Sequence, residues 1–154
     1  ALVSNEFAAL MTEHNARITL LSPLPVIKGH KEQLRILLHS LLDNSLKFRN
    51  KGIATSVTFS YEIASGNELI EIDIHLSHQK FHRITCSDNG IGFDKKFATR
   101  IFGLFQRLHS MDSQYDGKGV GLAFCQRIMA NHKGYILADG IPGKGASFKL
   151  YFPV

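Results

Sequence analysis

Two kinds of hydrophobic periodicity divide the chain into expected helices and strands. Apolar residues recur every three or four positions over 31–50 and again over 119–131, so both stretches are predicted to be amphipathic helices. Gly52 and Gly134 follow them, and glycine is a common helix stop. A short helix capped by Ser4 is predicted near the start of the chain. Its apolar face holds Phe7, Leu10 and Met11.

Alternation of apolar and polar residues predicts strands elsewhere. The candidates are 17–21, 57–63, 69–76, 83–87, 135–138 and 147–152. Residues 69–76 alternate less cleanly, and the stretch 65–83 is expected to form a lengthened hairpin or flap. Residues 94–102 are expected to form a short helix, and 103–118 are polar, mixed and expected to be mobile. Strands and helices mix without a regular βαβ order, which predicts an α+β fold of two layers.

Length and composition narrow the class of protein. The 154 residues fit one domain, 1–154, and 44% hydrophobic with 20% charged residues excludes wholesale disorder. No apolar run approaches the roughly 20 residues of a membrane span, and polar residues interrupt any secretory signal. The chain begins at Ala1 rather than Met, so we expect it to be a fragment of a longer protein.

Charge and cysteine content suggest partners and compartment. The formal net charge is +5 (18 − 13) and the pI is about 9.3, which favours anionic partners such as nucleotides, nucleic acids or acidic protein surfaces. Simple solubility explains the same charge equally well. Cys86 and Cys125 are far apart and form no CxxC pair, which indicates a reducing compartment and argues against a zinc site.

The first candidate for chemistry lies on the longest predicted helix. Asn44 and Lys47 are three residues apart, so they share one helix face. A neutral amide oxygen suits Mg²⁺, a lysine suits phosphate, and Phe48 offers an aromatic face to a base. Taken alone, this segment is better explained as a plain amphipathic helix with a polar outer face.

The second candidate is Asp88-Asn89-Gly90-Ile91-Gly92, which follows a predicted strand. A carboxylate beside two glycines places one hydrogen-bond acceptor next to backbone that can approach a ligand closely. The amino group of adenine is a donor that such an acceptor could bind. A tight turn, with Asp and Asn bonding to local backbone, explains the segment equally well.

The third candidate is Gly117-Lys118-Gly119-Val120-Gly121, at the start of the second strong helix. Alternate glycines expose backbone N–H groups to an anion at a helix N-terminus. The segment lacks the GxxxxGK[ST] of a P-loop and the spacing of a Rossmann fingerprint, so alone it is weak evidence.

In this order, the three segments resemble the ATP-binding catalytic domain of sensor histidine kinases. The wider superfamily includes DNA gyrase, the ninety-kilodalton heat-shock chaperone and mismatch-repair ATPases, and the likeness runs from about Pro23 to Pro153. The segments resemble the family's N, G1 and G2 boxes, and 101–109 resembles its F box. Leu46-Lys47-Phe48-Arg49 looks most like the phytochrome-type and hybrid bacterial branch. The resemblance implies a Bergerat-type sandwich, with a mixed, mostly antiparallel sheet covered on one face by helices.

The resemblance also assigns roles to residues. It implies ATP binding by Asn44, Lys47, Phe48, Asp88, Gly90, Gly92, Arg107, Gly117, Lys118, Gly119, Gly121, Leu122 and Ser147. Asn44 would hold Mg²⁺, Phe48 would stack on adenine, and Asp88 would accept from its amino group, with Ser147 supporting a bridging water. Lys47, Lys118 and Arg107 would contact phosphate. Residues 103–118 would form a mobile ATP lid, anchored by Phe102 and Phe105.

Two departures from the family pattern qualify the expected activity. Ser40, one helical turn before Asn44, replaces a second Asn of many kinases and the water-activating Glu of the ATPases, so we expect poor ATP hydrolysis and weaker Mg²⁺ binding. No catalytic residue is assigned, because the phosphoacceptor histidine belongs to a separate dimerisation domain. His14 is followed by Asn15 and fits a helix-surface histidine better.

The resemblance implies a kinase with several partners. The implied partners are the dimerisation and phosphotransfer domain of the same protein and a downstream response regulator, with no nucleic acid. The chain alone is expected to be monomeric, the full protein a homodimer, and this part cytoplasmic whether or not the whole protein is membrane-anchored. The alternatives are a regulatory module that binds nucleotide without phosphotransfer, a gyrase-type ATPase, which the missing Glu argues against, and a nucleic-acid binder supported only by charge.

Overall fold

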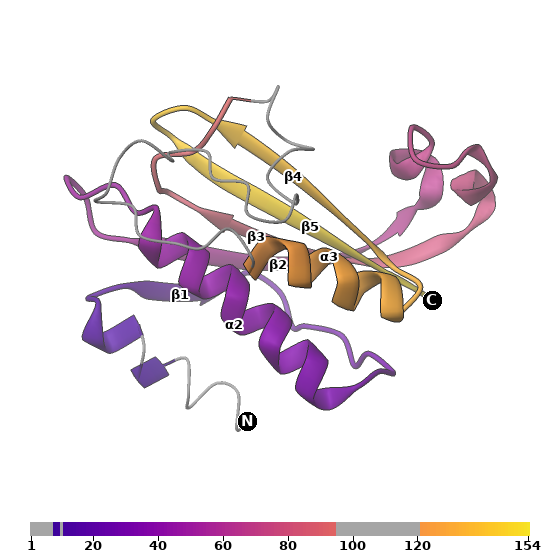
Figure 1. Cartoon of the computed structure of the whole chain (residues 1–154), viewed down its shortest axis with the longest axis horizontal. Helices are drawn as coiled ribbons and strands as arrows, with labels where there is room; N and C mark the ends of the chain where they lie inside the picture. Colours follow the sequence, from indigo (N-terminus) through magenta and orange to yellow (C-terminus); the bar gives the residue numbers. More distant parts are fainter. Residues whose placement is uncertain (1–7, 10, 95–120) are drawn as a thin grey trace.

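A five-stranded sheet and two helices form the two layers of the protein (Figure 1). The computed structural model describes residues 8–9, 11–94 and 121–154. The main elements are β1 (Arg17–Leu20), α2 (Lys31–Lys47), β2 (Ser56–Ser65), β3 (Lys80–Asp88), α3 (Gly121–Asn131), β4 (Tyr135–Ile141) and β5 (Gly145–Pro153). The strand order is β1-β2-β3-β5-β4, with β1 parallel to β2 and all other neighbours antiparallel. The predicted α+β sandwich is confirmed.

Five of the predicted strands are confirmed, and four extend beyond their predicted bounds. The extensions come from backbone pairing that side-chain alternation does not reveal. In the β2–β3 pair, for example, the register runs from Val57 opposite Asp88 to Ser65 opposite Lys80. β1 is one residue shorter than predicted.

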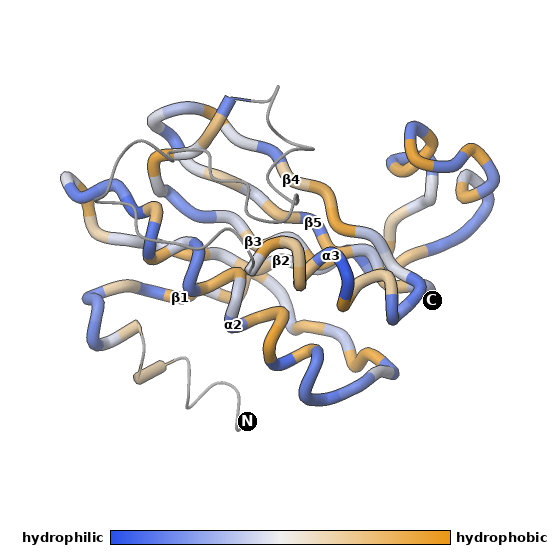
Figure 2. The backbone as a smooth tube through the Cα atoms, in the orientation of Figure 1, coloured by the Kyte–Doolittle hydropathy of each residue, from blue (hydrophilic) through white to orange (hydrophobic). Residues whose placement is uncertain are grey.

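The main core lies between the helices and one face of the sheet. Alternate residues of β2, β3 and β5 belong to it, and the leucines of α2 pack against them from the helix layer. Figure 2 shows hydrophobic residues interspersed with hydrophilic ones along α2 and the strands. The fully buried members include Leu37, Leu41, Leu42, Val57, Cys86, Cys125, Met129, Phe148 and Leu150. α3 packs beside α2 over the same face, so α2 is held by α3 as well as by the sheet.

α2 ends three residues earlier than the periodicity predicted. His30 caps its start, accepting from the Gln33 N–H through Nδ1, and Phe48 is the C-cap residue. His132 joins this helix to α3, because its Nε2 accepts from the His30 N–H at 3.0 Å. Its Nδ1 lies 2.8 Å from the Ile128 carbonyl, which fixes Nδ1 as the protonated nitrogen.

The predicted strand at 69–76 is wrong. The connection between β2 and β3 instead forms two 3-10 helices, η1 (Gly66–Leu69) and η2 (Ile74–His78), with Ser65 and Asp73 as their caps. Leu69 and Leu76 are buried, whereas the apolar residues between them are exposed. The apparent alternation therefore comes from two buried leucines with exposed isoleucines between them, and not from a strand. The expectation of a lengthened hairpin over 65–83 is confirmed, since β2 and β3 pair on either side of this connection.

This β2–β3 connection, residues 66–79, has a small core of its own. Leu69 and Leu76 pack with Ala64, Phe81 and Tyr151 on the sheet face opposite α2 and α3. In Figure 1 the connection forms the lobe at one end of the molecule.

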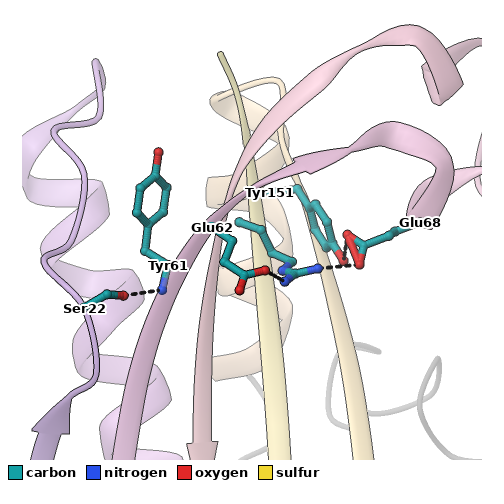
Figure 3. A network of polar contacts seen from close by, with 6 residues as sticks. Ser22, Tyr61, Glu62, Glu68 and Tyr151 are labelled. Carbon is teal, nitrogen blue, oxygen red and sulfur yellow. Dashed lines mark hydrogen bonds and ion pairs between the residues drawn. The ribbon is translucent and has the colours of Figure 1, made fainter.

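Polar contacts reinforce this attachment (Figure 3). The Arg83 guanidinium bridges the carboxylates of Glu62 and Glu68, and the Tyr151 hydroxyl donates to Glu68 at 3.3 Å. Burial and the neighbouring Glu68 raise the pKa of Tyr151 to about 12. Nearby, the Ser22 hydroxyl oxygen accepts from the Tyr61 N–H and ties the segment after β1 to β2. The connection is thus a docked part of the fold.

Several predictions fall on residues outside the described ranges. The helix at 94–102, the lid at 103–118, and Phe7 and Leu10 of the first short helix are among them. Residues 8–9 and 11–13 are helical, as predicted. Within the described ranges, no helix has the length and apolar character needed to span a bilayer.

Candidate functional site

Three segments that are distant in sequence meet where β3 ends. They are the end of α2, the loop after Asp88 and the hairpin between β4 and β5. Ile91 joins them: its N–H donates to the Phe48 carbonyl at 3.0 Å, and its carbonyl accepts from the Gly143 N–H at 2.7 Å. The segments that resemble the N and G1 boxes are therefore adjacent in space.

The Asp88 carboxylate lies at the centre of this junction. Its Oδ1 accepts from the backbone N–H groups of Gly90 at 2.9 Å and Ala146 at 3.1 Å. Its Oδ2 accepts from the hydroxyl of Ser45, on α2, at 3.0 Å. A carboxylate has about four lone-pair positions. Three are occupied by these protein donors, so one position on Oδ2 has no donor among the residues that the structure describes.

Two opposed effects act on the pKa of Asp88. Burial, the larger effect, raises the pKa of the carboxyl above its ordinary value, while the hydrogen bonds from Gly90, Ala146 and Ser45 lower it. The donors stabilise the charged form, which is the stronger hydrogen-bond acceptor.

The two glycines of the loop allow close contact with protein backbone. A Cβ on Gly90 would lie 2.5 Å from the Phe48 carbonyl oxygen. Gly92 has a φ of +67°, and a Cβ there would lie 2.2 Å from the Ile141 carbonyl oxygen. Both glycines are thus required by the packing of the loop between α2 and the β4–β5 hairpin. Their predicted place along a base pocket stays a prediction.

Asn89 secures the other side of the loop. Its Oδ1 accepts from the Ser56 N–H at 2.8 Å, and its Nδ2 donates to the Ala54 carbonyl at 2.9 Å. The loop is therefore tied to the start of β2 as well. The Asn side chain serves backbone bonds, but its partners are distant in sequence and not the local backbone of a tight turn.

The expected metal and phosphate residues lie on the last turn of α2. Asn44 is half-buried, and its carbonyl accepts from the N–H of Phe48, which is also half-buried. The Lys47 ammonium pairs with the Asp43 carboxylate at 3.1 Å, and both side chains are more than one-third exposed. Such exposed pairs contribute only about 0.3–0.5 kcal/mol, so a phosphate could compete for the lysine.

Ser40 is directed toward α3. Its hydroxyl is hydrogen-bonded to the thiol of Cys125, whose pKa burial raises to about 12. Burial also raises the pKa of Cys86, so both thiols are held protonated in the core. Ser40 therefore contributes to the contact between the helices, one turn away from Asn44.

Ser147 is not brought to Asp88, which corrects the expected role in supporting a water there. Its neighbours Ala146 and Phe148 pack toward the main core, so alternation turns Ser147 to the opposite sheet face. There it meets Ser87, with the two hydroxyl oxygens 3.4 Å apart. The residue of β5 that contacts Asp88 is Ala146, through its backbone N–H.

The remaining predicted residues are at the start of α3 or precede it in the sequence. Gly121 and Leu122 are its first two residues, and Leu122 packs against the main core. A Cβ on Gly121 would meet no atom of the described residues within 4 Å. Arg107, Gly117, Lys118 and Gly119 fall outside the described residues.

Ser45 is the site residue that sequence reasoning missed. It is almost fully buried, at 1% exposed, and follows Asn44 directly. Its signal was a small polar residue inside the apolar stripe of α2, four residues after Leu41 and next to Leu46. A hydroxyl in such a stripe needs an acceptor, and the Asp at the end of a strand is a candidate acceptor.

The donor set near the site suits one bound metal ion held largely by a ligand. In the described part of the chain, no group of three or more His, Cys, Asp and Glu residues could hold a metal. Asn44 offers a single amide oxygen. Mg²⁺ commonly takes one or two protein oxygens and completes its shell with phosphate and water, so this set fits Mg²⁺ with a triphosphate.

Comparison with known proteins identifies related chains. Residues 29–154 match the family described as histidine kinase-, DNA gyrase B-, and HSP90-like ATPase. Cyanobacterial phytochrome A of Nostoc sp. (strain PCC 7120) is 37% identical over 94% of this chain and 17% of its own length. Adaptive-response sensory kinase SasA of Thermosynechococcus vestitus is 35% identical over 85% of this chain and 30% of its own. The chain thus spans less than a third of these relatives.

Solved structures agree with the fold. Full-length ShkA in complex with AMPPNP is 25% identical and superposes with a TM-score of 0.68, over 99% of this chain and 30% of that one. The catalytic domain of histidine kinase ThkA, in a nucleotide-free form, gives a TM-score of 0.69 at 16% identity. That match covers 98% of this chain and 88% of the other, and at this identity it shows the fold alone.

Proposed function

The chain belongs to the family of histidine kinase-, DNA gyrase B- and HSP90-like ATPases, and from this premise we propose how it binds and uses ATP. It is an ATP-binding catalytic domain of the sensor histidine kinase type. In the proposal, adenine lies against the loop after β3 and donates its amino group to Asp88. The observation that carries this is the single lone-pair position left on Asp88 after its three protein donors.

The end of α2 serves the other parts of the nucleotide. Phe48 stacks on the base, Asn44 holds Mg²⁺ against the triphosphate, and Lys47 exchanges its exposed pair with Asp43 for phosphate. Gly121 lets α3 begin close to the phosphates, because no atom of the described residues fills the space beside it. Lys118, Arg107 and the glycines before α3 complete the site from the lid.

The proposed reaction is transfer of the γ-phosphate to a histidine on a separate dimerisation domain, and from there to a response regulator. Phosphoryl transfer needs positioning and charge neutralisation more than covalent help from protein. Ser40, engaged with Cys125, does not act as a general base, so hydrolysis by the domain alone is slow.

The test is calorimetric titration of the chain with ADP and a non-hydrolysable ATP analogue, with and without Mg²⁺, beside Asp88→Asn. In this variant the amide oxygen keeps both backbone donors, and the amide nitrogen donates to Ser45. If the amide were flipped, its own N–H groups would face the N–H groups of Gly90 and Ala146. The amide nitrogen is therefore held toward the base. We expect the variant to fold and to bind at least about 100-fold more weakly.

The outcomes separate the candidate functions. Binding that requires Asp88 and strengthens with Mg²⁺ supports the kinase domain. Binding that requires Asp88 but ignores Mg²⁺ favours a regulatory nucleotide-binding module, which the engagement of Ser40 with Cys125 also favours. No binding at millimolar nucleotide contradicts both.

A further inference from the structure

The hydroxyl of Ser45 is shared between two acceptors in the core. Its Oγ lies 3.1 Å from the Leu41 carbonyl oxygen and 3.0 Å from Asp88 Oδ2. The first contact is the ordinary back-bond of a helical serine, four residues along the chain. The second crosses from α2 to β3, over 43 positions in sequence.

The back-bond alone does not explain a buried serine here. Neighbouring inward residues of α2 are leucines, and an alanine would fill the same volume without a polar group. A hydrogen bond to a charged acceptor is stronger than one to a neutral carbonyl. The contact with the carboxylate is therefore the one that gives the hydroxyl a function.

The two ends of the carboxylate are held differently. Oδ1 accepts from the backbone N–H groups of Gly90 and Ala146, and among the described residues Oδ2 accepts only from Ser45. The direction of the carboxylate depends on the two side-chain torsions χ1 and χ2 of Asp88. The Ser45 hydroxyl holds the edge opposite the two N–H groups, so it narrows both torsions and with them the direction of the remaining lone pair on Oδ2.

We propose that Ser45 is a positioning residue for nucleotide selection: it orients the free acceptor of Asp88 so that the pocket selects purines that carry an amino donor. This rests on the proposed nucleotide site. Ser45 itself touches no base in the proposal and acts through Asp88. A purine without the amino group gains nothing from the orientation.

The test compares two nucleotides in two variants of the chain. ADP and a 6-unsubstituted purine riboside diphosphate share ribose and phosphates and differ only in the amino group. Ser45→Ala removes the hydroxyl with little loss of volume. Thr55→Val is the matched control, because Thr55 is also buried, at 5% exposed, and its substitution likewise removes one hydroxyl.

We expect Ser45→Ala to weaken ADP binding roughly tenfold and to change binding of the unsubstituted nucleotide less than twofold. Thr55→Val should leave the ratio of the two affinities unchanged. Ser45→Cys, which keeps a weaker donor, should fall between wild type and Ser45→Ala. An equal loss for both nucleotides, or none, overturns the positioning role.

The failure of this inference is distinct from failure of the proposed site. If wild type prefers ADP and Asp88→Asn abolishes that preference, the proposed site is supported. An unchanged ratio of the two affinities in Ser45→Ala then contradicts only the positioning role of Ser45. If wild type binds neither nucleotide, the site itself is wrong. Melting curves of each variant exclude loss of fold as the cause of weaker binding.

Discussion

The Asp88 carboxyl couples proton binding to nucleotide binding at a single residue. Its pKa lies above the ordinary value because it is buried, and the ionised form is the stronger acceptor for an amino group. Adenine nucleotide affinity should therefore fall on acidification at a higher pH than an ordinary Asp would give. The ratio of ADP to 6-unsubstituted purine nucleotide affinities, measured by calorimetry, cancels the titration of the phosphates. A ratio that stays constant down to pH 4 contradicts the assignment.

The same shift has the opposite effect on stability. A carboxyl with a raised folded pKa binds its proton more tightly when folded, so its contribution to stability is largest at low pH. That contribution is lost as the pH rises from the ordinary value through the raised one. Wild type should thus gain stability relative to Asp88→Asn on acidification, while it loses nucleotide affinity. Denaturant unfolding of both proteins between pH 4 and pH 7 measures this difference.

Gly92 and Gly143 offer a controlled pair of glycine substitutions. Both have positive φ, +67° and +78°, but a Cβ on Gly92 meets the Ile141 carbonyl at 2.2 Å and one on Gly143 meets nothing within 4 Å. Gly143→Ala should cost about 1 kcal/mol in the free energy of unfolding, from the left-handed conformation alone. Gly92→Ala should cost about 2 kcal/mol more, because the loop must also shift. Equal losses would contradict this account of the loop.

At the residue level, the sequence singled out one Asp at the end of a strand before two glycines. The structure places that Asp at the centre of the junction between α2, β3 and the β4–β5 hairpin, and its role toward a ligand stays a prediction. Ser147 failed because one residue of register decides which sheet face a side chain occupies. Ser45 was missed because its acceptor is 43 residues away, a pairing that no local pattern contains.

At the scale of elements, one substitution at the start of α3 can distinguish an effect on folding from an effect on ligand binding. Gly121 has open space beside it, and glycine is a poorer helix former than alanine. Gly121→Ala should therefore leave the free energy of unfolding unchanged or raise it by up to about 0.5 kcal/mol. If the phosphates approach this turn, the same change should weaken nucleotide binding. Unchanged binding, with stability retained, would remove Gly121 from the proposed site.

The attachment of the β2–β3 connection depends on one carboxylate more than the other. Both Glu62 and Glu68 pair with Arg83, but the Glu68 side chain is 34% exposed and the Glu62 side chain 70% exposed. Glu68 also accepts from Tyr151. Glu68→Gln should cost about 1–2 kcal/mol, and Glu62→Gln less than about 0.5 kcal/mol. Chemical denaturation measures both, and equal costs would contradict the ranking by exposure.

Elements were predictable from sequence where one face is buried and one is not. The stripe of α2 and the alternation of β2 each match a single face of the main core. The β2–β3 connection defeated the same reasoning, since its two buried leucines belong to a separate cluster on the opposite face of the sheet. A pattern that alternates over eight residues can thus arise from two anchors and a turn, and only tertiary contacts distinguish the two cases.

At the scale of the whole molecule, the described residues form two cores on opposite faces of the sheet, and the small core lies at one end of the β2–β3 pair. Asp88 lies opposite Val57 at one end, and Lys80 lies opposite Ser65 at the other. Eight residue steps of strand separate them, roughly 27 Å. The main core holds α2 and the site, whereas the small core holds only the connection to the outer face. We therefore expect that a change in the small core can lower the stability of the protein without weakening nucleotide binding beside Asp88.

Leucine truncations in the two cores test this separation. Leu42 and Leu69 are both essentially fully buried, in the main and the small core respectively. Each change to Ala should cost about 2–5 kcal/mol in the free energy of unfolding. Only Leu42→Ala should weaken nucleotide binding by the folded protein, because it loosens the helix that carries Asn44 and Ser45. Binding measured well below the midpoint of unfolding, and corrected for the folded fraction, distinguishes these effects. A loss of affinity in Leu69→Ala would show that the small core is coupled to Asp88 along β3.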